Sequence, residues 1–204
     1  MICIVNYGLG NIHAIVNIYH RLNIDVRIAS TTDDLSCADR IILPGVGAFD
    51  WAMTRLNQSG MRRKLDEMVL FDGIPVLGIC IGMQMMADRS DEGILHGLGW
   101  IDGEVKKFKS GPKDKNMRLP HMGWNNVRPL QDGGLFNGLD ADSRFYFLHS
   151  YFFQPHERTN VYAQTDYYGI FASCVHERNI YGVQFHPEKS HRWGIKLLKN
   201  FSEI

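Results

Sequence analysis

The chain has 204 residues, of which 45% are hydrophobic, so it can bury one sizeable core but is too short for two. Its 22 basic and 22 acidic side chains cancel, which argues against a nucleic-acid or other polyanionic partner. No apolar run approaches the length of a membrane span, and residues 1–5 have no basic leader. We therefore expect a cytoplasmic protein with no membrane partner.

The first half of the chain alternates short apolar segments with amphipathic ones. Strands are expected at residues 2–5, 24–29, 40–43 and 74–80, and helices at 12–22, 48–57, 61–71 and 81–88, with a short capped turn after residue 30. This alternation predicts a parallel sheet with helices on its faces, and functional residues at the carboxyl ends of its strands.

The loop after the first strand, Asn-Tyr-Gly-Leu-Gly-Asn at residues 6–11, resembles part of a phosphate-binding loop. However, His13 stands where the third glycine of Gly-x-Gly-x-x-Gly would be, and no Gly-Lys-Ser/Thr motif follows. A tight turn near a functional site is therefore favoured over a nucleotide site.

The second half has shorter extended segments and fewer helices. Strands are expected at residues 99–108, 120–127, 144–153, 161–165, 169–175 and 180–185, and a last helix at 190–201. Around the turn-rich residues 110–116 we expect a solvated basic face, formed by Lys106, Lys107, Lys109, Lys113, Lys115 and Arg118. The prediction is an α/β fold with a mostly parallel central sheet flanked by helices, antiparallel additions in the second half, and a single domain over residues 1–204.

The apolar segment 74–80 ends at Cys80, between two glycines, and a helix is expected to follow at once. Gly78-Ile-Cys-Ile-Gly82 has the form of the Gly-x-Ser-x-Gly nucleophile elbow, with sulfur in place of oxygen. Gly78 and Gly82 have no Cβ, so strand and helix can approach closely around a strained cysteine. A helix N-terminus stabilises the thiolate, the reactive form of cysteine. Cys80 is therefore a candidate nucleophile, and the alternative is a core cysteine between two glycines.

The other three cysteines, Cys3, Cys37 and Cys174, are far from Cys80 and from each other in the sequence, and no Cys-x-x-Cys pair occurs. This distribution argues against a disulfide framework and against a structural zinc site.

A catalytic thiol usually needs a base that a third group orients. The segment His-Pro-Glu near the end of the last strand offers both, because His186 and Glu188 lie on the same side of an extended chain and the proline disfavours a helix there. The alternative is a surface loop in which both face solvent, and His149 and His176 are competing bases. A metal site is disfavoured, because the spacing of His186, Glu188 and His191 fits no zinc-protease motif.

An acyl-transfer site also needs an oxyanion hole. By the geometry of the elbow, the N–H group of Ile81 is one donor. The segment Gly45-Val46-Gly47 ends a neighbouring strand, and its glycines allow a peptide to turn its N–H toward a ligand. The alternative is that these glycines only shape a turn.

These motifs together resemble the class I, or triad, glutamine amidotransferases over essentially the whole chain. The resemblance lies in Gly-Ile-Cys-Ile-Gly-Met-Gln (78–84), Pro-Gly-Val-Gly-Ala-Phe (44–49), Gln-Phe-His-Pro-Glu-Lys-Ser (184–190), Asn-Tyr-Gly-Leu-Gly-Asn (6–11), Pro-His-Met-Gly-Trp-Asn (120–125) and His-Ser-Tyr (149–151). Within this family, the chain is most similar to the glutaminase subunits of imidazole glycerol phosphate synthases, enzymes of histidine biosynthesis.

The resemblance implies a catalytic triad in which Cys80 attacks the side-chain amide of glutamine, His186 carries the proton and Glu188 orients His186. It also implies that Gly45, Val46 and Gly47 form the mobile half of the oxyanion hole. The groups that would hold the backbone of glutamine are Gln84, Ser150 and Tyr151.

The resemblance further implies a heterodimer with a (β/α)₈-barrel cyclase/synthase subunit that consumes the ammonia, and no cofactor or metal. The partner would be contacted by the loop that ends at Asn11 and by Met122, Gly123, Trp124 and Asn125. Independently of the family, the predicted elements leave no residues for an acceptor-binding or ATP-binding domain, so released ammonia is expected to pass to another chain.

Three alternatives remain open. Residues 90–93, 99–104 and 190–194 are also similar to paralogues that supply ammonia for amidination of a surface-polysaccharide sugar. A free-standing Cys-His hydrolase or redox protein would act alone and would not need Gln84 or the Trp124 segment. A catalytically idle binding module is disfavoured by the intact set of Cys80, His186 and Glu188.

Overall fold

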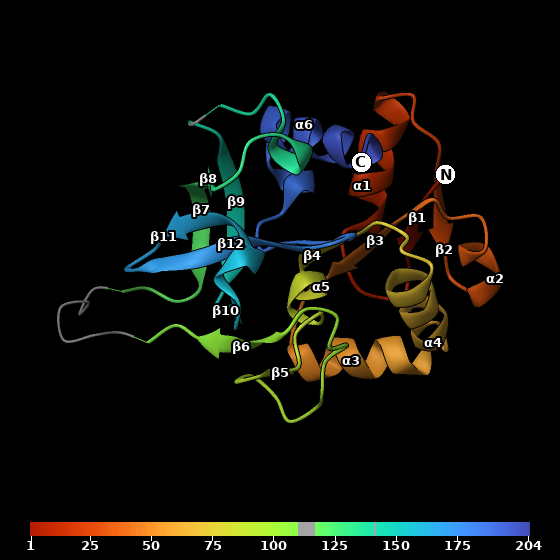
Figure 1. Ribbon diagram of the computed structural model, residues 1–204, viewed down its shortest axis with the longest axis horizontal. Helices are drawn as coiled ribbons and strands as arrows, with labels where there is room; N and C mark the ends of the chain where they lie inside the picture. The colour runs from red at the N-terminus through yellow and green to blue at the C-terminus, as the bar shows by residue number, and fades with distance from the viewer. Residues whose placement is uncertain (110–116, 141) are drawn as a thin grey trace.

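The computed structural model describes residues 1–109, 117–140 and 142–204. Its centre is an eight-stranded sheet with the strand order β2-β1-β3-β4-β13-β12-β11-β8 (Figure 1). The strands are β1 (Ile2–Val5), β2 (Val26–Ala29), β3 (Arg40–Gly45), β4 (Val76–Cys80), β8 (Arg128–Pro129), β11 (Val161–Asp166), β12 (Ile170–Glu177) and β13 (Ile180–Val183). The five strands from β2 to β13 are parallel and the other three are antiparallel additions, which confirms the predicted fold class.

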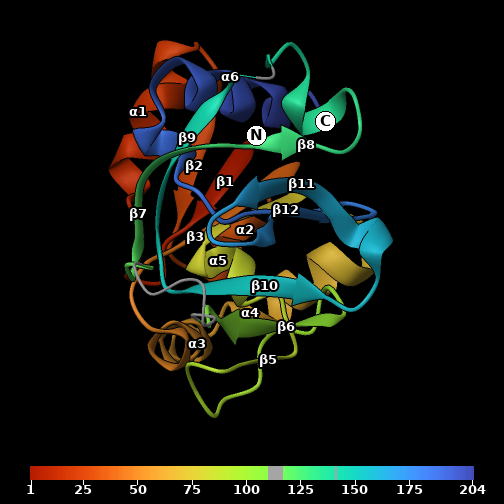
Figure 2. The ribbon, with the colours of Figure 1, turned by 90° about the vertical axis from the view of Figure 1, so that its left-hand side faces the viewer.

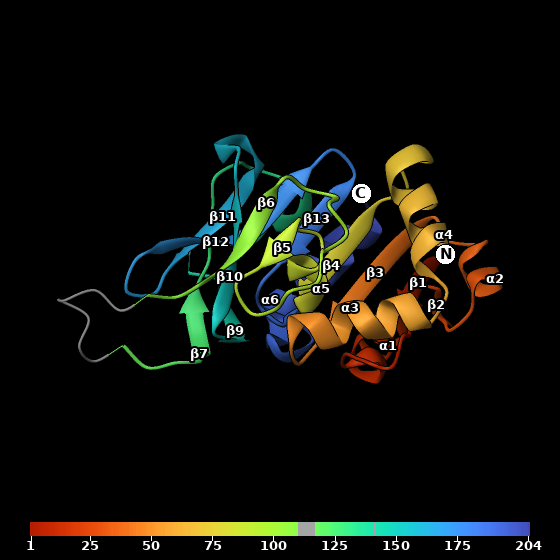
Figure 3. The same cartoon turned by 90° about the horizontal axis from the view of Figure 1, so that it is seen from below.

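Helices cover both faces of the parallel half. On one face lie α1 (Ile12–Arg21) and α6 (His191–Ser202), and on the other α3 (Phe49–Gln58) and α4 (Arg62–Asp66), which continues as a π-helical turn (Glu67–Phe71) (Figures 1 and 3). The buried Tyr19 hydroxyl donates a hydrogen bond to the Leu198 carbonyl at 3.0 Å, which joins α1 to α6 across the whole length of the chain. The short α2 (Thr32–Leu35) begins at the predicted cap, where Thr31 and Asp34 form a reciprocal capping box.

Two small sheets close the side of the molecule beyond β13. One has the order β10-β6-β5, with β5 (Arg89–Ser90), β6 (Gly103–Lys107) and β10 (Tyr151–Pro155), and the other pairs β7 (His121–Asn126) with β9 (Arg144–His149) (Figure 2). Single 3₁₀ turns occur at Gly134–Phe136, Arg158–Asn160 and Pro187–Lys189.

The helix predicted for residues 81–88 is shorter than expected, because α5 ends after one turn (Ile81–Gln84). The carbonyl groups of Met85, Met86 and Ala87 accept hydrogen bonds from the N–H groups of residues 98–101. These pairings with a segment more than ten residues away replace the next helical turn.

The strand predicted for residues 144–153 is two strands in different sheets. The chain leaves β9 after His149, which pairs with His121, and enters β10 at Tyr151, which pairs with Lys107. Apolar alternation continues through the switch, so the sequence pattern does not show where the pairing partner changes. The turn-rich residues 110–116, with Lys113 and Lys115 of the predicted basic face, lie outside the described residues.

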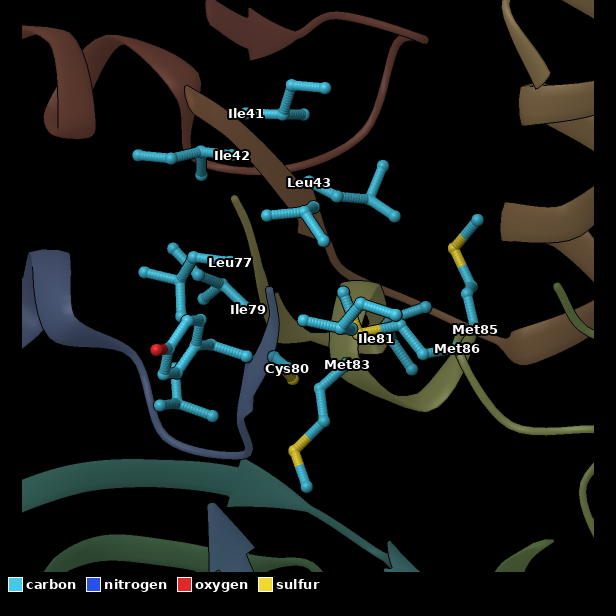
Figure 4. Close-up of a cluster of buried hydrophobic side chains, with 14 of the residues drawn as sticks. Ile41, Ile42, Leu43, Leu77, Ile79, Cys80, Ile81, Met83, Met85 and Met86 are labelled. Carbon is cyan, nitrogen blue, oxygen red and sulfur yellow. The ribbon is translucent and has the colours of Figure 1, made fainter. Parts of the chain in front are cut away.

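A hydrophobic core supports the end of β4. Side chains of β3 and of β4 pack against the methionines that follow Ile81 (Figure 4). Burial of each such large apolar side chain stabilises the fold by roughly 1.5–3 kcal/mol. No helix in the described ranges has the combined length and apolarity that crossing a bilayer requires.

Candidate active site

Cys80 lies at a sharp turn between β4 and α5. Its φ of +55° is unusual for a residue with a side chain, and such a backbone costs roughly 1–3 kcal/mol. A Cβ atom at Gly82 would lie 1.8 Å from the Leu43 carbonyl oxygen, and one at Gly78 would lie 2.7 Å from the Met83 nitrogen. Both positions therefore require glycine, and the close approach of β4, α5 and β3 holds the strained cysteine in place.

His186 and Glu188 follow β13, the parallel neighbour of β4, so they reach the same edge of the sheet as Cys80. His186 Nδ1 lies 2.9 Å from Glu188 Oε1, and the two side chains are 4% and 2% exposed. Burial alone would lower the pKa of His186, but hydrogen bonds and charge interactions with Cys80 and Glu188 raise it to about 10. The interactions of His186 with the sulfur of Cys80 and the carboxylate of Glu188 therefore both favour its charged form.

A cavity of about 300 Å³ opens at this edge of the sheet. Among the residues that the sequence predicts for the site, it is lined by Val46, Gly47, Cys80, Ile81, Gln84, Ser150, Tyr151 and His186. It is also lined by residues that the sequence motifs do not assign to the site, namely Glu92, Pro120, Leu148, His149 and Lys189. The cavity therefore gathers side chains from all three sheets.

The Gln84 carboxamide connects the cavity wall to Cys80, the candidate nucleophile, through Gln184. Its Nε2 donates to the Tyr151 carbonyl at 3.1 Å and to Gln184 Oε1 at 2.9 Å. Gln184 Nε2 in turn donates to Cys80 Sγ at 3.7 Å. Only Phe185 separates Gln184 from the His-Pro-Glu segment in the sequence, but it is the fold that shows the Gln184 amide facing the sulfur.

The candidate oxyanion segment, Gly45-Val46-Gly47, is tightly packed at Gly45 and has open space beside Gly47. Gly45 pairs with Cys80 in the β3–β4 register, and a Cβ atom there would lie 2.8 Å from the Gly82 nitrogen. Gly47 has a φ of +92° and no atoms near the position of a Cβ. The N–H group of Phe49, which begins α3, donates to Glu92 Oε2 at 2.8 Å. Glu92 therefore joins the end of this segment to the cavity wall.

The residues predicted to face a partner lie on two elements. Asn11 is exposed at the start of α1, and Met122, on β7, is 61% exposed. Trp124 is half-buried because its ring stacks on His191 with 5.2 Å between the centroids. Asn125 donates to the Asp166 carbonyl at 2.9 Å. The contact between Trp124 and His191 of α6 joins two segments that are far apart in the sequence, and no sequence pattern predicts it.

The residues considered for a metal site have other partners. His191 stacks on Trp124, and Glu188 is hydrogen-bonded to His186. Elsewhere in the described ranges, one exposed group with possible metal-ligand atoms within 4.8 Å of one another consists of Asp88, Asp102 and His156. None of these three lines the cavity at Cys80.

Known proteins match the chain at the level of family and of fold. The family model described as glutamine amidotransferase class-I matches residues 3–203. Curated relatives named imidazole glycerol phosphate synthase subunit HisH are 57% identical in Bdellovibrio bacteriovorus and 45% identical in Leptospira interrogans, each over 100% of both chains. A crystal structure of a glutamine amidotransferase aligns with a TM-score of 0.75 at 16% identity over 99% of this chain and 97% of the other. A glutamine amidotransferase from Thermotoga maritima aligns with a TM-score of 0.65 at 17% identity over 99% and 82%.

Proposed function

Since the chain belongs to the class-I glutamine amidotransferase family, we propose that it is the glutaminase subunit of an imidazole glycerol phosphate synthase, hydrolysing glutamine to glutamate and ammonia for histidine biosynthesis. The observation that carries the proposal is the buried arrangement of Cys80, His186 and Glu188 at the carboxyl ends of adjacent parallel strands. The name shared by full-length relatives at 40–57% identity supports the pathway.

In the proposed reaction the Cys80 sulfur attacks the side-chain amide carbon of glutamine. The imidazolium of His186 donates its proton to the amide nitrogen as the C–N bond breaks, so ammonia leaves and a γ-glutamyl thioester remains. Water then attacks the thioester while His186 accepts its proton, and breaking the C–S bond releases glutamate. Glu188 holds the imidazole ring and stabilises its positive charge.

The oxyanion formed at each step needs two donors. The N–H group of Ile81 has no partner within the single turn of α5 and is one of them. A peptide N–H of the segment Gly45-Val46-Gly47 is the other. Gln84, Ser150 and Tyr151 line the cavity next to Cys80 and would hold the backbone groups of glutamine.

Members of this family work with a synthase partner that uses the ammonia, and we further propose that the partner here is a (β/α)₈-barrel. Residues 1–204 would form one cytoplasmic glutaminase domain of a heterodimer, docked through the Asn11 loop and strand β7. The exposure of Met122 and the ring stack of Trp124 at the edge of a small sheet support this surface.

The deciding experiment measures glutamine hydrolysis by the chain alone and with the histidine-pathway barrel subunit carrying its nucleotide substrate. We expect the lone chain to be nearly silent, because the Gly45-Val46-Gly47 segment is expected to turn its N–H toward the site only when the partner is docked. One missing oxyanion donor costs about 10²–10³ in rate. Full activity of the lone chain, unaffected by any partner, would favour the free-standing hydrolase. Stimulation only by the partner of a sugar-amidinating system would reassign the pathway.

Variants of the triad test the catalytic roles in the same assay. Cys80→Ser is expected to abolish hydrolysis without changing the circular dichroism spectrum, and His186→Ala to lower kcat by about 10²–10⁴-fold. Glu188→Ala should be milder than either, because the carboxylate acts through His186. Normal turnover by Cys80→Ser would rule out the nucleophile.

A further inference from the structure

Two buried histidines face each other next to the cavity. His121 and His149 are register partners across β7 and β9, and they are 3% and 6% exposed. His121 Nδ1 lies 2.9 Å from His149 Nε2. His149 Nδ1 lies 2.8 Å from the carbonyl oxygen of Tyr151, which belongs to the cavity wall. The pair therefore connects β7 to that wall.

These contacts determine which ring nitrogen carries each proton. A carbonyl oxygen only accepts, so His149 donates from Nδ1 and its Nε2 is an acceptor, and His121 must then donate from Nδ1. The N–H of Asn126 donates to Asn125 Oδ1 at 2.8 Å, which leaves Asn125 Nδ2 as the donor to His121 Nε2 at 3.3 Å. The direction of this series of hydrogen bonds is therefore set by the Tyr151 carbonyl at one end and by the Asn126 N–H at the other.

All of these bonds form together only if both rings are neutral. Burial lowers the pKa of His121 to about 4. Burial, together with the nearby charges of His121 and His186, lowers the pKa of His149 to about 3, although its bond to the Tyr151 carbonyl acts in the opposite direction. A second proton on either ring would place two N–H groups against each other.

At the Tyr151 end, this series of hydrogen bonds determines how the Gln84 carboxamide is oriented. The Tyr151 carbonyl accepts a second hydrogen bond from Gln84 Nε2, whose other proton goes to Gln184 Oε1. With both donor positions used, Gln84 Oε1 is buried and has no hydrogen-bond partner among the described residues. A side chain that lines the cavity thus has one acceptor without a partner among the described residues.

We propose that the His121–His149 pair is a positioning relay: it holds the Tyr151 carbonyl, and through it the Gln84 carboxamide, in the orientation that binds the backbone ammonium group of glutamine. This inference rests on the proposed function, because it takes glutamine as the ligand. Neither histidine touches the reacting atoms, so both act through Gln84.

The relay also connects the cavity to the surface proposed for the partner. Asn125 and His121 lie on the same strand as Met122 and Trp124. A shift of β7 when the partner docks would therefore change the bonds that orient Gln84, without any movement of the parallel sheet.

The first test is His121→Phe in the complex with the synthase partner. Phenylalanine keeps the ring stack on Tyr167 and Phe147, whose centroids lie 3.9 and 4.6 Å from that of His121, but removes both ring nitrogens. We expect KM for glutamine to rise about 3–10-fold with kcat changed less than about twofold, as for the loss of one hydrogen bond that serves ground-state binding. An unchanged KM would overturn the relay.

The matched control is His176→Phe. His176 also stacks on an aromatic ring, with 4.3 Å to the Tyr181 centroid, but it lies outside the relay. Its KM for glutamine should stay at the wild-type value. A rise equal to that of His121→Phe would show that the loss of any stacked histidine produces the effect, and would overturn the assignment.

A double-mutant cycle separates the relay from a general loss of packing. In a Gln84→Ala background, His121→Phe should cause no further rise in KM, because the residue through which it acts is missing. If the two substitutions raised KM independently, so that the double variant showed the product of the two single changes, the relay would be contradicted.

A measurement on the wild-type chain needs neither glutamine nor a variant that folds. Nitrogen-15 imidazole spectra at neutral pH should show both rings neutral and protonated at Nδ1. A charged ring, or a proton on Nε2 of either ring, would overturn the relay whatever the kinetics. If instead the wild-type complex hydrolyses no glutamine while these spectra hold, the proposed function fails and the hydrogen-bond chain does not.

Discussion

At the scale of single residues, the candidate site depends on one charged group that the fold stabilises. His186 is buried between the sulfur of Cys80 and the carboxylate of Glu188, and the interactions with both outweigh the effect of burial on its pKa. Both interactions favour the protonated form of His186, which is the form that the proposed reaction needs when ammonia leaves.

This charge should appear in the pH dependence of stability. The folded-state pKa of His186, about 10, lies above its ordinary value of 6.5, so its contribution is complete below pH 6.5 and is lost as the pH rises toward 10. We expect the difference in free energy of unfolding between wild type and His186→Gln to shrink over this range. Urea unfolding at several pH values measures it, and a constant difference would contradict the assignment.

The sequence predicts the members of the candidate triad, but it does not show which groups Gln184 and His121 contact. Cys80 and His186 lie in motifs whose spacing alone indicates their chemistry. In the sequence, Gln184 is a glutamine in the strand predicted for residues 180–185, and His121 is a histidine in a short extended segment. Their partners, Gln84 and His149, are 100 and 28 residues away in the chain, so only the fold reveals their roles.

At the scale of elements, local patterns locate the strands and helices of the parallel half, where each element is bounded by its own caps and turns. These local patterns fail where contacts with a distant segment determine where an element ends or which strand it pairs with. The chain stops α5 after one turn because residues 98–101 bind the next carbonyls, and it divides residues 144–155 between two sheets at Ser150.

The close packing of α5 gives a test at this scale. Alanine is the better helix former, so propensity alone would stabilise Gly82→Ala by about 1 kcal/mol. The clash of its Cβ with the Leu43 carbonyl should outweigh this gain, so the free energy of unfolding should fall by roughly 3 kcal/mol or more. Gly60→Ala is the control, because Gly60 has a φ of +74° but open space around it and should lose only about 1–2 kcal/mol. Urea unfolding compares the two, and equal losses would refute the steric argument.

At the scale of the whole molecule, the cavity and β7 lie beyond the carboxyl ends of the parallel strands. If β7 is the docking surface, we expect Trp124→Ala to raise the Kd for the proposed barrel subunit by about 30-fold, as for an interface residue that contributes about 2 kcal/mol. Phe71→Ala is the control, because Phe71 is 83% exposed just before β4, at the opposite edge of the sheet. Calorimetric titration measures both, and an equal Kd for the two variants would exclude β7 as the docking surface.

The position of β13 has a consequence for biosynthesis. This strand, made late, inserts between β4 and β12 and is the only described strand that pairs with the free side of β4. Until residue 183 has left the ribosome, the nascent chain presents the apolar strand Val76–Cys80 as an open edge, available for pairing with other chains. Cys80, at the end of this strand, is thus synthesised early but enclosed late, and in that interval we expect the open edge to be most prone to pairing with other chains.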